Sequence, residues 1–214
     1  MDKNQKYVIT INRELGSGGR TVGRILSEKL GVPFYDKALI NELKAKYNLT
    51  TNEIEKLKGS KTNWWREFIN TAMYLGQGMN EVWYYDRMAG QETHLVTSSE
   101  MFEVEKEILK NVAEEESCVI AGRSGFSVFK DHPNHLSILI QAPMEHRIQR
   151  IMRKQNLSHE EAEKIIDKVD EMRENYVKKY TGTSRYDARN YNLVISSEGK
   201  TEEEVAALIL QYIG

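Results

Sequence analysis

A glycine-rich turn near the N-terminus separates a segment with the pattern of a strand from a segment with the pattern of a helix. Residues 7–11 (YVITI) are short and β-branched, which predicts a buried strand. The turn at 16–19 (GSGG) follows, and residues 22–30 then carry apolar side chains at helical spacing, up to a helix stop signal at Gly31. This order of strand, tight turn and helix predicts the first unit of an α/β fold.

The alternation of short apolar runs and helical patterns continues along the chain. Further strands are predicted at 33–36, 118–121, 136–140 and 193–195, and helices at 37–47, 98–116, 144–155, 159–180 and 201–213. Ser158 and Thr201 are predicted N-caps, because each is followed three residues later by a glutamate. Strands that are apolar throughout indicate a parallel sheet with helices on both faces, and such sheets bind ligands outside the carboxyl ends of their strands.

The composition limits the classes of partner and the compartment. The 214 residues fit one domain, and 30 basic against 32 acidic residues give a net charge of −2, which argues against a protein-wide grip on nucleic acid or an anionic membrane. The single cysteine, Cys118, excludes an intramolecular disulfide and fits a reducing compartment. Neither a membrane span nor a signal-peptide core is predicted, so we expect a cytoplasmic protein. Oligomeric state stays open.

A glycine turn between a strand and a helix has the geometry of a phosphate cradle, because backbone N–H groups converge on an anion at the helix N-terminus. The P-loop pattern G-x-x-x-x-G-K-[ST] is not matched: Gly19 stands in place of the lysine, or, one residue along, Gly19-Arg20-Thr21 replaces Gly-Lys-Thr. Arg20 could supply the missing cation, and Arg13 and Arg24 are the next candidates for that role. Thr21 could supply a hydroxyl for Mg²⁺. The alternative is a tight turn without a ligand, but three glycines within four residues favour phosphate binding.

Two segments resemble a known family. Residues 9–40 (ITINRELGSGGRTVGRILSEKLGVPFYDKALI) resemble the opening of the cytidylate kinases, most closely the cytidylate kinase-like proteins of bacteria. Residues 118–180 resemble that family's third strand with its Gly-Arg, its fourth strand and its arginine-rich lid. The resemblance implies a P-loop NTPase-type three-layer α/β fold, with a five-stranded parallel sheet, a helical NMP-binding lobe and a lid.

The resemblance also assigns residues to sites. Its implied site consists of the phosphate-loop residues Gly16, Ser17, Gly18, Gly19, Arg20 and Thr21, the acceptor-site residues Asp36, Lys37, Arg123, Asp170 and Arg173, and the lid arginines Arg147, Arg150 and Arg153. ATP with Mg²⁺ would bind the loop, and CMP, dCMP or a related phosphate-bearing small molecule would be the acceptor. Two alternatives remain: a nucleotide-binding sensor with little turnover, and a kinase for a non-nucleotide small molecule.

Each basic residue of this implied site could also have a structural role without any ligand. Arg147, Arg150 and Arg153 recur every three residues and sweep one helix face, which could close over phosphates or simply face solvent. Arg123 directly follows a predicted strand and a glycine, so it could reach a phosphate in the cleft or form a surface ion pair. Phosphoryl transfer requires cations around the transferred group, which favours the first alternative in both cases.

The acidic residues are equally ambiguous. Asp170 and Arg173 lie three residues apart and could bind an acceptor or pair with each other. Asp36, followed by Lys37, could orient an acceptor or cap the next helix. No His/Cys metal-ligand spacing is present, so Mg²⁺ would arrive with the nucleotide.

The chain is predicted to form a single domain over residues 1–214. Residues from about 50 to 95 hold all three tryptophans and are predicted to form a helical, aromatic-rich inserted lobe. Residues from about 147 to 190 form the predicted arginine-rich lid region. The expected partners are small molecules, with neither nucleic acid nor membrane among them.

Overall fold

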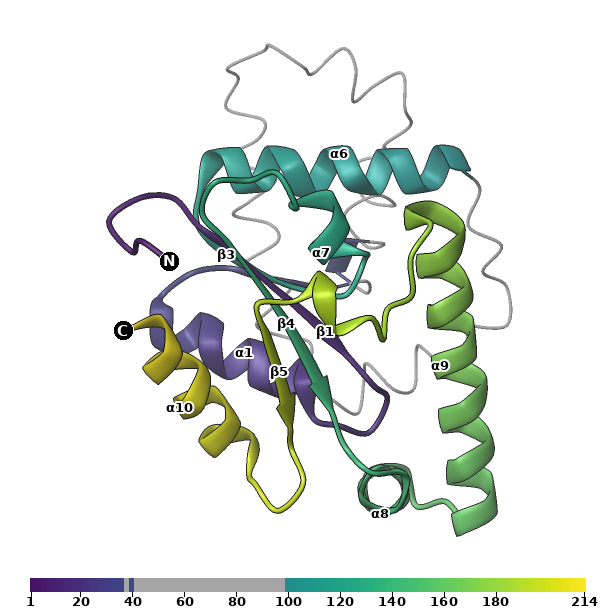
Figure 1. Ribbon diagram of the computed structural model, residues 1–214. Coiled ribbons are helices and arrows are strands. Elements are labelled where there is room, and N and C mark those ends of the chain that lie inside the picture. The colour runs from purple at the N-terminus through teal and green to yellow at the C-terminus, as the bar shows by residue number, and fades with distance from the viewer. Residues whose placement is uncertain (37–38, 41–98) are drawn as a thin grey trace.

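Five short apolar segments pair into one parallel sheet in the computed structural model, which describes residues 1–36, 39–40 and 99–214 (Figure 1). The strands are β1 (Val8–Arg13), β2 (Phe34–Asp36), β3 (Cys118–Ala121), β4 (His135–Gln141) and β5 (Leu193–Ser196). Their order is β2-β3-β1-β4-β5, so β1 lies in the centre between β3 and β4. The predicted α/β class with an all-parallel sheet is confirmed.

The helices also follow the predicted pattern within the described residues. They are α1 (Gly19–Leu30), α6 (Ser99–Glu115), α7 (Gly125–Val128), α8 (Met144–Gln155), α9 (His159–Thr181), α10 (Glu202–Ile213) and the short 3₁₀ helix η2 (Ala188–Asn190). Among these described helices, α7 and η2 were not expected from the sequence, since each is too short to show a helical period. The aromatic-rich lobe at about 50–95, and most of the helix predicted at 37–47, lie outside the described residues.

Each face of the sheet is covered by different helices. Alternate residues of β1, Ile9 and Ile11, belong to a core that includes apolar side chains of α1 and α10. Thr10 faces the other way and contacts α7, where a Cβ on Gly125 would lie 2.8 Å from Thr10 Cγ2. This alternation follows from the two-residue period of a strand and explains why residues 8–11 of β1 are buried on both faces of the sheet.

A second core joins the glycine-rich turn to the helices that follow β4. Leu15 of the turn packs with Ile148 and Ile151 of α8 and with Ala162, Ile166 and Val169 of α9. The turn is therefore held by apolar contacts with the predicted lid region, as well as by its own strand and helix.

The strand connections create a crevice above the centre of the sheet. The chain leaves β1 through α1 toward β2 at one edge, whereas it leaves the neighbouring β3 through α7 toward β4 on the other side of β1. Loops that diverge in this way leave room at the carboxyl ends of the strands, where ligands of such sheets bind. The residues that follow β1 and β3 therefore lie where a ligand of this sheet would bind.

Both predicted capping boxes are present. Ser158 Oγ accepts a hydrogen bond from the backbone N–H of Glu161 at 3.3 Å, and Thr201 Oγ1 accepts one from Glu204 N–H at 3.2 Å. These caps set the first residues of α9 and α10. Over the part of the chain that the structure describes, no helix is long and apolar enough to cross a membrane.

We predict that Ile209→Ala destabilises the protein by about 2–5 kcal/mol, because it leaves a cavity between α10, α1 and the sheet. Ile209 is fully buried in that core. Leu208→Ala is the matched control, since Leu208 on the same helix is 43% exposed. Urea denaturation followed by circular dichroism measures both, and equal losses in the two variants would contradict this packing.

Candidate phosphate-binding site

The turn between β1 and α1 adopts the geometry of an anion-binding loop. Gly16 and Gly18 have φ angles of 86° and 78°, in the left-handed region that favours glycine. Gly16 also contacts α8 closely, since a Cβ there would lie 2.8 Å from Arg147 Cβ. The first turn of α1 carries neither an acidic residue nor a side-chain cap, so its N–H groups and positive end can serve an anion.

Ser17 anchors this loop from within. Its buried hydroxyl donates to the backbone carbonyls of Glu14 at 3.0 Å and Ile140 at 3.1 Å. Its own carbonyl accepts a hydrogen bond from Ser197 Oγ at 2.8 Å. The loop is thereby tied to the ends of β4 and β5, which holds its backbone in place for a ligand.

A buried carboxylate, Asp170 of α9, connects the loop to three guanidinium groups. Its Oδ1 accepts from the backbone N–H of Leu15 at 3.0 Å, and its Oδ2 accepts from Arg147 Nη1 at 2.7 Å. Arg185 Nη1 lies 3.3 Å and Arg173 Nη1 3.5 Å from Oδ1. The two residues predicted as an acceptor pair do contact each other, and Asp170 contacts the phosphate loop as well.

Arg185 is the residue of this network that sequence reasoning missed. Its side chain is fully buried, and one of its terminal nitrogens donates to the backbone carbonyl of Arg13. Burial, followed by the nearby charge of Arg173, lowers the pKa of the Arg185 guanidinium. Its backbone carbonyl accepts from Tyr191 Oη at 2.6 Å, and burial raises the pKa of that hydroxyl to about 12, so Tyr191 stays a donor.

The three arginines of α8 have different surroundings. Arg147 and Arg150 are buried: the first pairs with Asp170, and the second pairs with Glu202 of α10 at 2.6 Å and donates to Thr21 Oγ1 at 3.3 Å. Arg153, two turns along from Arg147, is exposed. The predicted basic face therefore brings its first two members to the glycine loop, and its third member remains exposed.

Arg20 and Asp36 form a buried pair beside the loop. Arg20 Nε donates to Asp36 Oδ2 at 2.7 Å, and Asp36 Oδ1 accepts from the backbone N–H of Leu39 at 2.9 Å. Asp36 thus caps the segment that follows it, which was one of its two expected roles. Lys37 lies outside the described residues.

Arg123 follows β3 and Gly122, as predicted, with a left-handed φ of 56°. Its guanidinium pairs with the buried Glu105 of α6 and stacks on the ring of Tyr176, 5.0 Å from its centroid. Burial raises the pKa of the Tyr176 hydroxyl. Glu105 was another missed residue, because on a helix rich in glutamate nothing in the sequence distinguishes the buried one.

Comparison with known proteins identifies the family. The chain matches the cytidylate kinase-like family over residues 8–199. It belongs to this family. A cytidylate kinase of Sulfolobus acidocaldarius is 25% identical over 211 residues, which cover 96% of this chain and 93% of that protein. An uncharacterized protein from Eubacterium ventriosum has the same fold, with a TM-score of 0.69, 22% identity and 98% of each chain covered.

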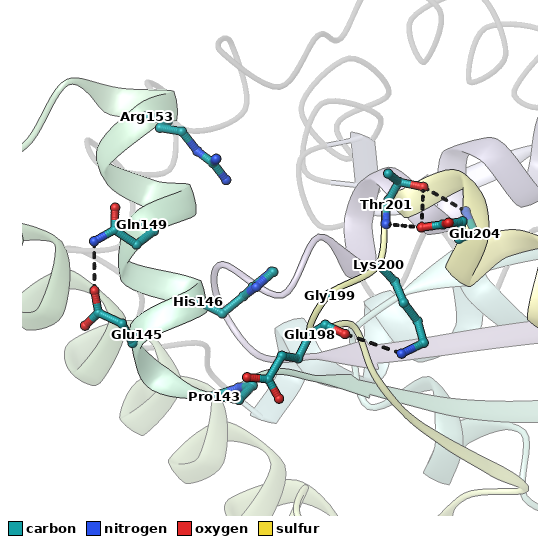
Figure 2. A pocket seen from close by; sticks show the side chains of 10 residues that line it. All are labelled: Pro143, Glu145, His146, Gln149, Arg153, Glu198, Gly199, Lys200, Thr201 and Glu204. Atoms are coloured by element: carbon teal, nitrogen blue, oxygen red, sulfur yellow. Dashed lines mark hydrogen bonds between the residues drawn. The ribbon is translucent and has the colours of Figure 1, made fainter.

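This cytidylate kinase-like protein has a cavity of about 550 Å³ between α8 and the β5–α10 connection. Figure 2 shows His146, Gln149 and Arg153 of α8 on one side and Glu198, Lys200 and Thr201 of the β5–α10 connection on the other. The Arg150–Glu202 pair joins the same two elements, and Glu202 packs on Gly18, with its Oε1 3.2 Å from where a Cβ would be. The two elements that line the cavity therefore also meet beside Gly18, through Arg150 and Glu202.

A resident metal site has no support in the described ranges. No group of three or more histidine, cysteine or acidic side chains gathers there in a way that could hold a metal ion. The Thr21 hydroxyl accepts a hydrogen bond from Arg150, so its predicted role as a Mg²⁺ ligand stays a prediction.

We predict that Asp170→Asn destabilises the protein by about 3–5 kcal/mol, because it leaves buried guanidinium groups without their shared carboxylate. Asp167→Asn is the matched control, since Asp167 is exposed on the same helix. Thermal and urea denaturation measure both variants. If Asp170→Asn proves as stable as the control, the network does not hold the loop.

Proposed function

We propose that this family member is an ATP-dependent phosphotransferase that phosphorylates CMP, dCMP or a related phosphate-bearing acceptor. The observation that carries the proposal is the glycine loop at the positive end of α1, with guanidinium groups near it from β1, α8, α9 and the α9–β5 connection. The match to the cytidylate kinase-like family supports the same chemistry.

The transfer itself needs positioning and charge neutralisation rather than a strong base. The triphosphate of ATP binds the backbone N–H groups of residues 16–21, and an oxygen of the acceptor phosphate attacks the γ-phosphorus. A new P–O bond forms, the bond from the γ-phosphorus to the bridging oxygen breaks, and its electron pair leaves with ADP. The acceptor phosphate is already ionised, so no side chain has to remove a proton.

The remaining site residues have complementary roles in this proposal. Asp36, Lys37, Arg123, Asp170 and Arg173 form the acceptor side, and Arg20, Arg147, Arg150 and Arg153 neutralise phosphate charge. The cavity between α8 and the β5–α10 connection receives the donor nucleoside, since the Arg150–Glu202 pair links these two elements beside Gly18 and the cavity's volume of about 550 Å³ suits a small molecule. Mg²⁺ arrives bound to the nucleotide, and Thr21 is its candidate protein ligand.

A second candidate function is a nucleotide-binding sensor with little turnover. Two observations favour it: Gly19 stands in place of the P-loop lysine, and Arg20 is held by Asp36 at 2.7 Å. Both would weaken transfer without preventing binding.

A coupled ADP-release assay with CMP, dCMP, UMP, AMP and GMP tests the main proposal. We expect acceptor-dependent ADP release, fastest with CMP or dCMP, and only background release when the acceptor is omitted. Tight ATP binding without acceptor-dependent release would support the sensor instead. Rejection of every nucleotide together with turnover on another small molecule would support a kinase for a non-nucleotide small molecule.

We also predict that Glu202→Gln strengthens ATP binding about twofold to fivefold, because it removes a negative charge beside the N-terminus of α1. Glu203→Gln is the matched control, since Glu203 is the exposed neighbour on the same helix turn. Isothermal titration calorimetry measures both affinities. Weaker binding in Glu202→Gln would mean that Glu202 acts mainly by orienting Arg150.

A further inference from the structure

We propose that Arg13, the last residue of β1, is the phosphate-contacting cation of this loop and takes the place of the lysine that a P-loop carries. The inference rests on the proposed function and adds one catalytic residue to it. It is carried by two glycines, Gly19 and Gly122, whose missing side chains leave room for the Arg13 side chain.

The stem of Arg13 fills the space above Gly19. A Cβ built on Gly19 would lie 2.6 Å from Arg13 Cβ and 3.1 Å from Arg13 Cγ. Real Cβ contacts essentially never come this close, so side chains at residues 13 and 19 exclude each other and one of the two positions must be glycine. A lysine at residue 19 would therefore require glycine at residue 13, which is where the pattern G-x-x-x-x-G-K has its first glycine; in this chain the cation stands at residue 13 and the glycine at residue 19.

The head of Arg13 extends to the end of β3. A Cβ on Gly122, the residue after β3, would meet Arg13 Nη1 and would lie 3.4 Å from Arg13 Cζ. The guanidinium thus lies over the ends of β1 and β3, which pair side by side and whose connections diverge. This is the crevice in which a sheet of this kind binds its ligand.

The backbone of Arg13 is held firmly, which gives the side chain a fixed base. Arg13 pairs with Ile140 in the register of β1 and β4, and its carbonyl accepts a hydrogen bond from the buried Arg185. Arg20, the other candidate cation of the loop, is directed to Asp36 of β2. A pre-positioned cation stabilises developing charge without having to reorganise during the reaction.

Exchanging the two positions tests the proposal. Arg13→Gln is expected to lower kcat/KM for ATP-dependent transfer by at least about 100-fold, the usual cost of losing a transition-state donor. Gly19→Lys alone is expected to be equally poor, because its Cβ meets Arg13. Arg13→Gly combined with Gly19→Lys is expected to recover at least about tenfold over Arg13→Gly, a rescue that a merely structural role would not show. Glycine is needed at residue 13 because alanine would keep the clashing Cβ.

Arg189→Gln is the matched control for the loss of one guanidinium, since the Arg189 side chain is 89% exposed. Circular dichroism and melting temperatures confirm that each variant is folded. Unchanged kcat/KM in Arg13→Gln, or no recovery in the double variant, would overturn the role of Arg13.

A binding measurement keeps the inference separate from the proposed function. Calorimetric titration with ATP and with inorganic tripolyphosphate should show at least about tenfold weaker binding in Arg13→Gln than in the unaltered protein, a difference of about 1.4 kcal/mol. If the unaltered protein turns over no acceptor, the proposed function fails, and this titration still decides the inference. Equal affinities in Arg13→Gln and the unaltered protein would overturn it.

Discussion

The arrangement of the site depends on the hydrogen bonds and ion pairs of one buried group, the Asp170 carboxylate. It accepts the backbone N–H of Leu15 and lies within 3.5 Å of a nitrogen on each of Arg147, Arg173 and Arg185. Buried guanidinium groups are costly unless a charge compensates them, so this one carboxylate keeps α8, α9 and the α9–β5 connection in register with the glycine loop. Any shift of the predicted lid helices must therefore act on the loop that would hold the phosphates.

Two features of the structure require glycine at positions of the site: a left-handed backbone conformation and the close approach of arginine residues. Gly16 has a left-handed φ and also lies against the backbone of Arg147, while Gly19 and Gly122 both leave room for Arg13. The departure from the P-loop pattern at residue 19 thus coincides with the close approach of Arg13.

Local sequence patterns predicted much of the fold and part of the site. The strands, the long helices and the capping boxes at Ser158 and Thr201 depend on contacts within a few residues, and those predicted within the described residues are present, whereas most of the helix predicted at 37–47 lies outside them. The glycine loop and Arg123 were found because each directly follows a strand. Arg185 and Glu105 could not be found in this way, since Arg185 contacts a residue 172 positions away and Glu105 differs from its neighbours only in being buried.

The sequence by itself determined which segments form strands and helices and which cations follow the strands, because periodicity and capping act over a few residues. The tertiary structure alone decided which partner each arginine has: Asp36 for Arg20, Asp170 for Arg147, Glu202 for Arg150 and Glu105 for Arg123. The physical reason is that the order β2-β3-β1-β4-β5 and the helix packing bring together residues that are distant in the chain. Which opposite charges meet in a buried pair therefore depends on the folded arrangement and cannot be read from spacing.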